Sequence, residues 1–119
     1  MTNVLLDAKA LSSIAVEALQ EKKGREILRM DLRDADGSVT DFFVLCTGTS
    51  DRHVQALADS VMEIMSKNGE KPHNKEGIDK AEWILLDYVN IVVHIFQGDT
   101  RAFFRLEDLW GDAKIERIE

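Results

Sequence analysis

Residues 81–96 constrain the fold of this chain more than any other segment, because they contain two apolar stretches separated by a very short turn. This pattern is typical of a β-hairpin. Two residues are unusual for a hairpin that is buried on both sides: Trp83 opens the first strand, and His94 interrupts the second. We therefore expect one face of the hairpin to serve a purpose other than core packing.

The second strand of the hairpin has one face that suits a core better than the other. Successive side chains of a strand point to opposite faces. One face carries Ile91, Val93 and Ile95, and the other carries Val92, His94 and Phe96. A lone histidine among apolar neighbours is usually a hydrogen-bonded structural residue, but an exposed aromatic patch with a polar group marks a protein interface. We expect the isoleucine–valine face to point inward and the His94 face to point outward.

The composition indicates one globular domain over residues 1–119, because 45% of the residues are hydrophobic and 31% are charged. No apolar run approaches the roughly 20 residues of a membrane span, and the N-terminus has no basic region or cleavage site of a secretory signal. The lone Cys46 cannot form an internal disulfide, which favours a reducing, cytoplasmic location. Phosphate backbones repel a net charge of −7, so we expect a basic protein partner, with no membrane and no sequence-specific nucleic acid.

Apolar periodicity predicts the fold class, α/β (α+β). The expected helices span 7–22, 51–67 and 100–110, with Gly24 and Gly69 ending the first two and Ser50 or Asp51 capping the second. The expected strands are half-buried over 26–33, central over 42–46, and those of the hairpin, while 69–80 is expected to be a polar loop. The order helix, strand, strand, helix, strand, strand, helix predicts a single mixed sheet of four to five strands with helices mainly on one face.

Residues 47–50, Thr-Gly-Thr-Ser, lie between a strand and a helix and allow two interpretations. Free backbone N–H groups and the helix dipole bind phosphates at such positions, although a tight turn with an N-cap is more common. A nucleotidyl- or phosphoryl-transferase would use Gly48, Ser50 and Asp87, but Asp87 has no partner carboxylate on its strand for two-metal chemistry. The histidines are too dispersed for a metal site. We expect no catalytic residue, metal or cofactor, and the transferase is the alternative.

From residue 40 onward, a series of short motifs resembles one family, the ribosomal silencing factors or Iojap-like proteins. The motifs are Thr40-Asp41-Phe42-Phe43-Val44, Cys46-Thr47-Gly48-Thr49-Ser50, Arg52-His53, Ala58-Asp59, Pro72, Glu76-Gly77, Trp83-Ile84-Leu85-Leu86-Asp87, Val92-Val93-His94-Ile95-Phe96 and Leu106-Glu107-Asp108-Leu109-Trp110. Each motif is weak alone, but the ordered series is specific.

The resemblance implies a nucleotidyltransferase-like αβ fold without catalytic activity. Such proteins bind the large ribosomal subunit, chiefly through large-subunit ribosomal protein fourteen on its intersubunit face. By occupying that face they block joining of the small subunit and repress translation when nutrients are scarce. The missing carboxylate pair and the acidic charge of this chain agree with such a role.

The resemblance also implies a partner-binding surface on the hairpin and around it. The residues it implies are Trp83, Leu85, His94 and Phe96, with Asp87 and Tyr88 at the rim and Arg101 and Leu106 as further contacts. The family usually has Gly-Asp where this chain has Val89-Asn90. Because valine resists the positive φ of a type I′ turn, we expect a wider turn or one that uses Asn90. A second hypothesis is a homodimer in which the hairpin face pairs with itself.

Overall fold

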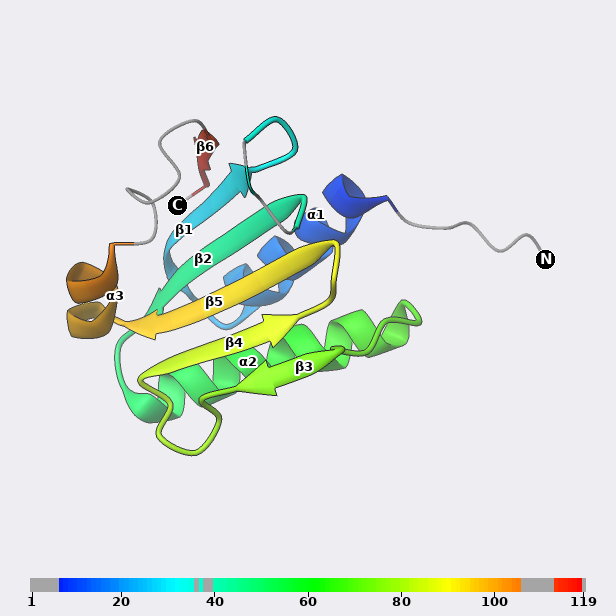
Figure 1. The fold of residues 1–119 in the computed structure, drawn as a ribbon. Helices are drawn as coiled ribbons and strands as arrows, with labels where there is room; N and C mark the ends of the chain where they lie inside the picture. The colour runs from blue at the N-terminus through cyan, green and yellow to red at the C-terminus, as the bar shows by residue number, and fades with distance from the viewer. Residues whose placement is uncertain (1–6, 36, 38–39, 106–112, 119) are drawn as a thin grey trace.

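The computed structural model describes residues 7–35, 37, 40–105 and 113–118, and these residues form one mixed sheet with helices (Figure 1). The elements in chain order are α1 (Ala8–Glu21), β1 (Arg25–Asp31), β2 (Phe42–Gly48), α2 (Asp51–Lys67), β3 (Asn74–Glu76), β4 (Trp83–Asp87), β5 (Ile91–Gln97), α3 (Gly98–Phe104) and β6 (Lys114–Arg117). The described helices include none that is long and apolar enough to cross a membrane.

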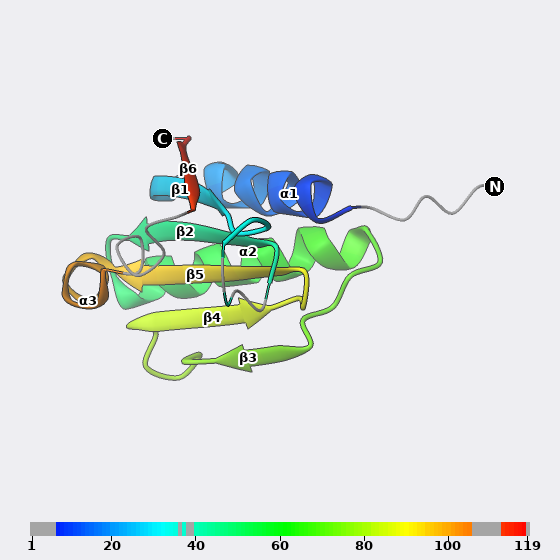
Figure 2. The same cartoon turned by 45° about the horizontal axis from the view of Figure 1, so that its top comes forward.

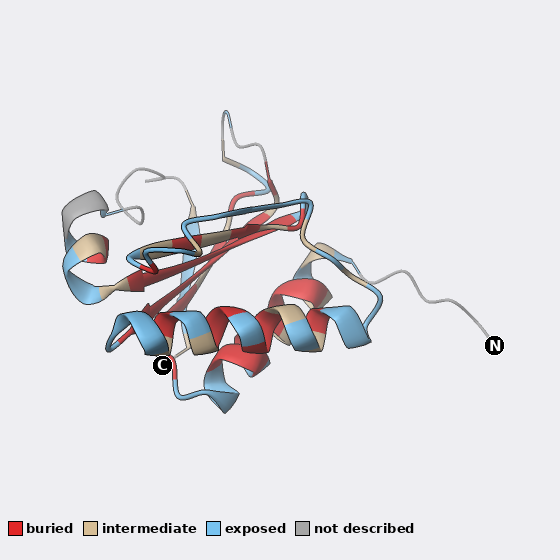
Figure 3. Cartoon of the chain, turned by 90° about the horizontal axis from the view of Figure 1, so that it is seen from below, coloured by how far each residue is buried: buried red, intermediate tan, exposed pale blue. Residues whose placement is uncertain are grey.

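The six strands lie in the order β3-β4-β5-β2-β1-β6, which places β3 and β6 at opposite edges of the sheet (Figure 2). β2 and β5 are parallel, and the other neighbouring pairs are antiparallel. α1 and α2 cover one face, with their buried residues turned toward the sheet (Figure 3). The predicted fold class and one-sided helix packing are confirmed. We call the face opposite α1 and α2 the open face because neither of these helices covers it, although its side chains on β1, β2 and β5 are largely buried.

Two of the six strands, β3 and β6, were not predicted from the sequence. The predicted polar loop over 69–80 contains β3, which pairs with β4, and the chain after α3 returns as β6, which pairs with β1. All residues of both strands are exposed. Because neither strand buries one face more than the other, neither shows the alternation by which a strand is recognised.

The start of α2 agrees with its predicted cap, because the Ser50 hydroxyl accepts a hydrogen bond from the His53 N–H at 3.1 Å. α1 is capped by Asp7, for which no cap was predicted: its carboxylate accepts a hydrogen bond from the Ala10 backbone N–H at 2.8 Å. Gly69, with a φ of 82°, follows the end of α2 as predicted.

The predicted role of Gly24 in ending α1 is wrong. Lys23 takes the left-handed conformation, with a φ of 60°. Gly24 is required for a different reason: a Cβ atom there would lie 2.4 Å from the sulfur of Cys46 on β2. The glycine therefore allows the chain to leave α1 and pass close against the central strand.

The last helix is shorter than predicted. α3 spans Gly98–Phe104, and Arg105 ends it in a left-handed conformation with φ 49° and ψ 55°. Leu106 and Trp110, which were expected on this helix, lie outside the described residues.

The hairpin turn consists of the two residues Val89 and Asn90, so the expectation of a wider turn is wrong, whereas the turn does use Asn90. Val89 itself has a φ of 74°, and its N–H donates to the Asp87 carboxylate at 2.8 Å. The Tyr88 N–H donates to the Ile91 carbonyl at 2.9 Å and closes the turn. A tight turn preserves the register, in which Trp83 lies opposite Phe96 and Leu85 opposite His94.

Candidate partner-binding surface on the open face

The open face carries its own apolar cluster, and the predicted inward face of β5 is confirmed. Ile91, Val93 and Ile95 pack with α1 and α2. Val92 and Phe96 belong to the second cluster, whose other buried members are Leu28, Met30, Leu32, Phe43 and Leu45. The expectation that the His94 face is exposed is wrong for all three of its residues, because Val92 is 8% exposed, His94 4% and Phe96 0%.

Trp83 lies over this cluster and is itself only partly buried. Its ring centroid is 4.9 Å from that of Phe96 at an interplanar angle of 30°, and its indole N–H donates to Nδ1 of His94 at 3.0 Å. On the other side of His94, the Phe43 ring meets the imidazole edge-on, with the centroids 4.6 Å apart. These contacts hold the indole in one orientation against a buried aromatic platform.

The hydrogen bond from Trp83 fixes the tautomer of neutral His94. Because Nδ1 accepts a hydrogen bond, the neutral ring carries its proton on Nε2. Nε2 is buried and has no hydrogen-bond partner among the described residues. Burial lowers the pKa of His94 to about 3, so the imidazole is neutral at physiological pH and acts as an acceptor for the indole.

The structure separates the predicted interface residues into two groups. Trp83, Leu85 and Asp87 alternate along β4 on the open face and are each partly accessible. Tyr88, predicted at the rim, is buried in the core beneath the helices. Arg101 is also buried, where one Nη atom donates at 2.7 Å to both the Glu26 carbonyl and the Thr47 hydroxyl. Leu106 lies outside the described residues.

A surface groove of about 630 Å³ adjoins Trp83 and was not predicted from the sequence. Its lining comes from the loop before β4, from β3 and β4, and from α3: Lys75, Gly77, Ile78, Asp79, Lys80, Glu82, Trp83 and Thr100. Gly77 has a φ of 79°, and a Cβ atom there would lie 2.0 Å from the Trp83 carbonyl oxygen. The glycine thus lets the loop approach β4.

The alternative phosphate site at residues 47–50 is occupied by the protein itself. The Thr49 N–H donates to Nδ1 of His53 at 2.9 Å, the His53 N–H to Ser50, and the Arg52 N–H to the Asp51 carboxylate at 2.8 Å. An anion would have to displace these partners and approach the Asp51 carboxylate. The turn therefore acts as a helix cap.

The three residues of the alternative transferase site do not converge. Gly48 pairs with Gln97 at one end of β5, whereas Asp87 pairs with Val92 near the other end. Five residues of strand separate these positions, a distance of about 17 Å. The described residues also contain no group of three His, Cys, Asp or Glu side chains arranged to hold a metal ion.

Comparisons with known proteins agree with the fold and identify the family. The family model "Ribosomal silencing factor during starvation" matches residues 6–119. The ribosomal silencing factor of Bacillus subtilis is 36% identical over 114 residues, which cover 96% of each chain. A crystal structure of a Chromobacterium violaceum protein superimposes with a TM-score of 0.85 at 33% identity, covering 89% of this chain and 88% of that one.

A mouse relative is named for the large ribosomal subunit. "Mitochondrial assembly of ribosomal large subunit protein 1" is 30% identical over 108 residues, which cover 88% of this chain and 47% of the mouse protein. The match of the family model over nearly the whole chain, together with these relatives, shows that the chain belongs to the family of ribosomal silencing factors.

Proposed function

We propose that this protein binds the large ribosomal subunit through the open face around Trp83 and sterically prevents the small subunit from joining. Translation is thereby repressed when nutrients are scarce, and the site of action is the cytoplasm. The partner is a protein of the intersubunit face, large-subunit ribosomal protein fourteen. The protein turns over no substrate in this role.

The observation that carries the proposal is the partly accessible indole of Trp83 on its buried platform. Aromatic residues at the centre of an interface dominate binding energies when they are rigid and well packed. Trp83 loses little conformational freedom on binding, because Phe96 and His94 already fix its ring. Leu85 and Asp87 extend the same surface along β4.

The charge of the chain favours a basic protein as the partner. The net charge is −7, so the dense negative phosphates of an RNA surface would repel the chain. Opposite net charges accelerate the encounter of two proteins and disfavour wrong partners. A basic protein on the ribosome would match both the aromatic surface around Trp83 and the negative charge of the chain.

Subunit joining tests the proposal directly. Isolated large subunits are incubated with the protein before small subunits are added, and sucrose gradients measure the fraction of joined ribosomes. We expect joining to fall as the protein reaches saturation. Undiminished joining at saturating protein would refute occlusion, even if the protein still sediments with the large subunit.

Trp83→Glu tests the position of the surface. Loss of an aromatic interface centre costs about 2 kcal/mol or more, so the affinity for the large subunit is expected to fall about 30-fold or more. Met62→Glu is the matched control, because Met62 is also partly buried but lies on α2 at the opposite side of the sheet. Both variants are compared by pelleting with large subunits after their folding is verified by circular dichroism. Equal affinities of the two variants would place the interface elsewhere.

A further inference from the structure

A pocket of about 200 Å³ with a local excess of positive charge lies at the β6 edge of the sheet. Its charged lining comes from α1, from β1 and the residues just after it, and from β6: Lys9, Arg29, Asp31, Arg33, Lys114 and Glu116. Four cations and two carboxylates give a local charge of +2, in a chain whose net charge is −7. Such a local excess attracts an anion.

Strand pairing brings the charged residues of β1 and β6 together on one face of the sheet. Lys114 lies opposite Asp31, and Glu116 lies opposite Arg29. Residues that alternate along a strand share a face, and directly opposite residues of an antiparallel pair are neighbours. Arg29 donates a hydrogen bond to the Ser12 hydroxyl of α1 at 3.2 Å, so this face is the one that α1 covers.

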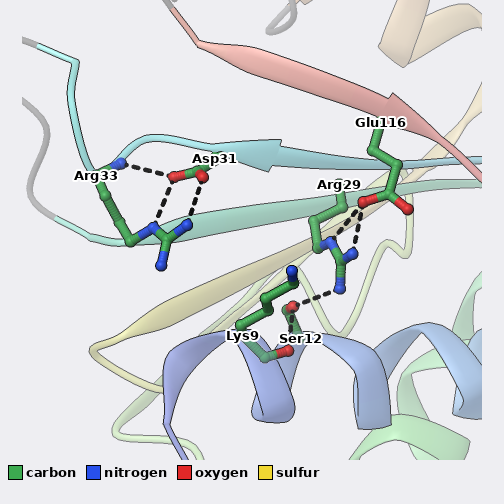
Figure 4. Close-up of polar contacts among 6 residues, drawn as sticks. All are labelled: Lys9, Ser12, Arg29, Asp31, Arg33 and Glu116. Carbon is green, nitrogen blue, oxygen red and sulfur yellow. Dashed lines mark hydrogen bonds and ion pairs between the residues drawn. The ribbon is translucent and has the colours of Figure 1, made fainter.

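The two arginines of the pocket are already held in place by its carboxylates (Figure 4). Nε and Nη2 of Arg29 both donate to Oε1 of Glu116. Nε of Arg33 lies 3.0 Å from Oδ1 of Asp31 and its Nη2 lies 2.7 Å from Oδ2, while its guanidinium carbon lies 4.9 Å from the centroid of the Phe42 ring. These contacts orient both guanidinium groups before any ligand arrives.

The two lysines of the pocket are not used in this way. Lys9 and Lys114 form no ion pair among the described residues. Figure 4 shows Lys9 rising from α1 toward the strands, between Arg29 and Arg33. Hydrogen bonds from Arg33, together with the charges of Arg33 and Lys114, lower the pKa of Asp31 to about 2, which indicates a positive potential at this carboxylate. The lysines are therefore available to pair with a bound anion.

The combination of donors and an acceptor favours hydrogen phosphate over other anions. A phosphate group carries a charge of about −1.5 to −2 at pH 7, which matches the local charge of the pocket. Hydrogen phosphate also keeps a P–O–H group that donates a hydrogen bond, whereas sulfate and the phosphodiesters of nucleic acids have no such proton. Oδ2 of Asp31 accepts a single hydrogen bond from Arg33, and a carboxylate oxygen has room for a second donor.

The size of the pocket limits the ligand further. Sites for drug-sized ligands have volumes of about 300–1,000 Å³. The volume of this pocket, about 200 Å³, lies below that range. The pocket therefore suits a single phosphate better than a whole nucleotide.

We propose that this pocket binds inorganic phosphate, with the ammonium groups of Lys9 and Lys114 and the remaining Nη1 atom of Arg33 as donors. Oδ2 of Asp31 accepts the hydrogen bond from the P–O–H group. Bound phosphate thus connects α1, β6 and the segment after β1. The strands β5 and β2 separate β4 from β1, and Trp83 lies on the open face, so this site does not depend on the proposed ribosome binding.

NMR titration of the isotope-labelled protein tests the proposal at neutral pH and constant ionic strength, because salt screens exposed charges. Potassium phosphate, potassium sulfate and dimethyl phosphate are compared. We expect phosphate to shift the amide signals of Arg33 and Lys114 to saturation, and sulfate to bind about fivefold more weakly because it lacks one hydrogen bond. Dimethyl phosphate, which represents a nucleic-acid backbone, is expected not to saturate. Absence of saturation by phosphate, equal binding of sulfate, or saturation by dimethyl phosphate would overturn the proposal.

Substitutions of the two lysines test the donors. Lys9→Gln and Lys114→Gln each remove one charge without breaking an ion pair, so each is expected to weaken phosphate binding about fivefold or more. Lys71→Gln is the matched control, because Lys71 is also exposed but does not line the pocket. Unchanged signals away from the substituted residue verify the fold of each variant. Equal phosphate affinities of the control and the two pocket variants would contradict the assignment of the donors.

Asp31→Asn tests the acceptor separately from the charge. The substitution makes the pocket more positive, so sulfate is expected to bind at least as tightly as it binds the wild type. The preference for phosphate over sulfate is expected to disappear, because a charged acceptor for the P–O–H group is lost. A preference for phosphate that survives in this variant would show that Asp31 does not accept the proton and would overturn the proposed binding mode.

Discussion

The burial of His94 makes the stability of this protein depend on pH in a defined window. The imidazole is neutral in the fold because burial lowers its pKa to about 3, whereas in the unfolded chain it titrates near 6.5. Below pH 6.5 the unfolded chain binds a proton that the folded protein does not. The contribution of neutral His94 to the free energy of unfolding is therefore fully present above pH 6.5 and is lost as the pH falls toward 3.

The magnitude follows from the linkage between proton binding and folding. Each pH unit inside this window changes the free energy of unfolding by about 1.4 kcal/mol for one proton. Between pH 6.5 and pH 5 the titration of His94 alone lowers the free energy of unfolding by about 2 kcal/mol. This is a large part of the stability of a typical domain, which is about 5–15 kcal/mol.

Urea unfolding followed by circular dichroism between pH 7.5 and pH 5 measures this effect against His94→Gln. Glutamine keeps an acceptor for the Trp83 indole but does not titrate. The other histidines and the carboxylates are common to both proteins, so they cancel in the difference between the two stabilities. We expect the advantage of the wild type to shrink by about 2 kcal/mol over this range. A difference that is independent of pH would refute the argument that His94 is buried as the neutral form.

Three further substitutions or reactions test separate features of the fold. Val89→Gly is expected to raise the free energy of unfolding by about 0.5–1 kcal/mol in urea titrations, because relief of the left-handed conformation exceeds the entropic cost of glycine; a loss of stability would contradict the turn geometry. Arg101→Ala is expected to cost about 2–3 kcal/mol in the same assay, since the carbonyl of Glu26 and the hydroxyl of Thr47 lose a buried donor; a variant of unchanged stability with weakened ribosome binding would instead make Arg101 an interface residue. Burial raises the pKa of the Cys46 thiol to about 12, so the native protein should react with iodoacetamide at pH 8 only at the rate at which it unfolds, as monitored by mass spectrometry; rapid modification without urea would contradict this burial.

The elements predicted correctly are those whose own residues carry the signal. α1 and α2 each bury one stripe and begin at a side chain that accepts hydrogen bonds from their first turn. β2 is buried at every residue, and its continuous apolar run over 42–46 signalled a strand covered on both faces. The facing of β5 follows from alternation alone, once one set of side chains is clearly the better core.

The contacts on the open face could not be predicted from local sequence patterns. Trp83 and His94 were recognised as unusual, but their hydrogen bond joins two strands and depends on the register of the hairpin. That register depends in turn on Val89 accepting a positive φ, which is unfavourable for an isolated valine and is imposed by the pairing of the two strands. The burial of His94 and Phe96 likewise depends on neighbours such as Phe43, which lies far away in the sequence.

The sequence by itself determined the two long helices, the central strands, the hairpin and the identity of its two faces, because periodicity and capping are local properties of the chain. Only the tertiary structure decided the edge strands β3 and β6, the close contact of Gly24 with Cys46, and the structural role of Arg101. It also separated the accessible residues of the open face from the buried platform that supports them. These features arise from contacts between distant segments, and exposed edge strands leave no pattern of burial in the sequence from which they could be predicted.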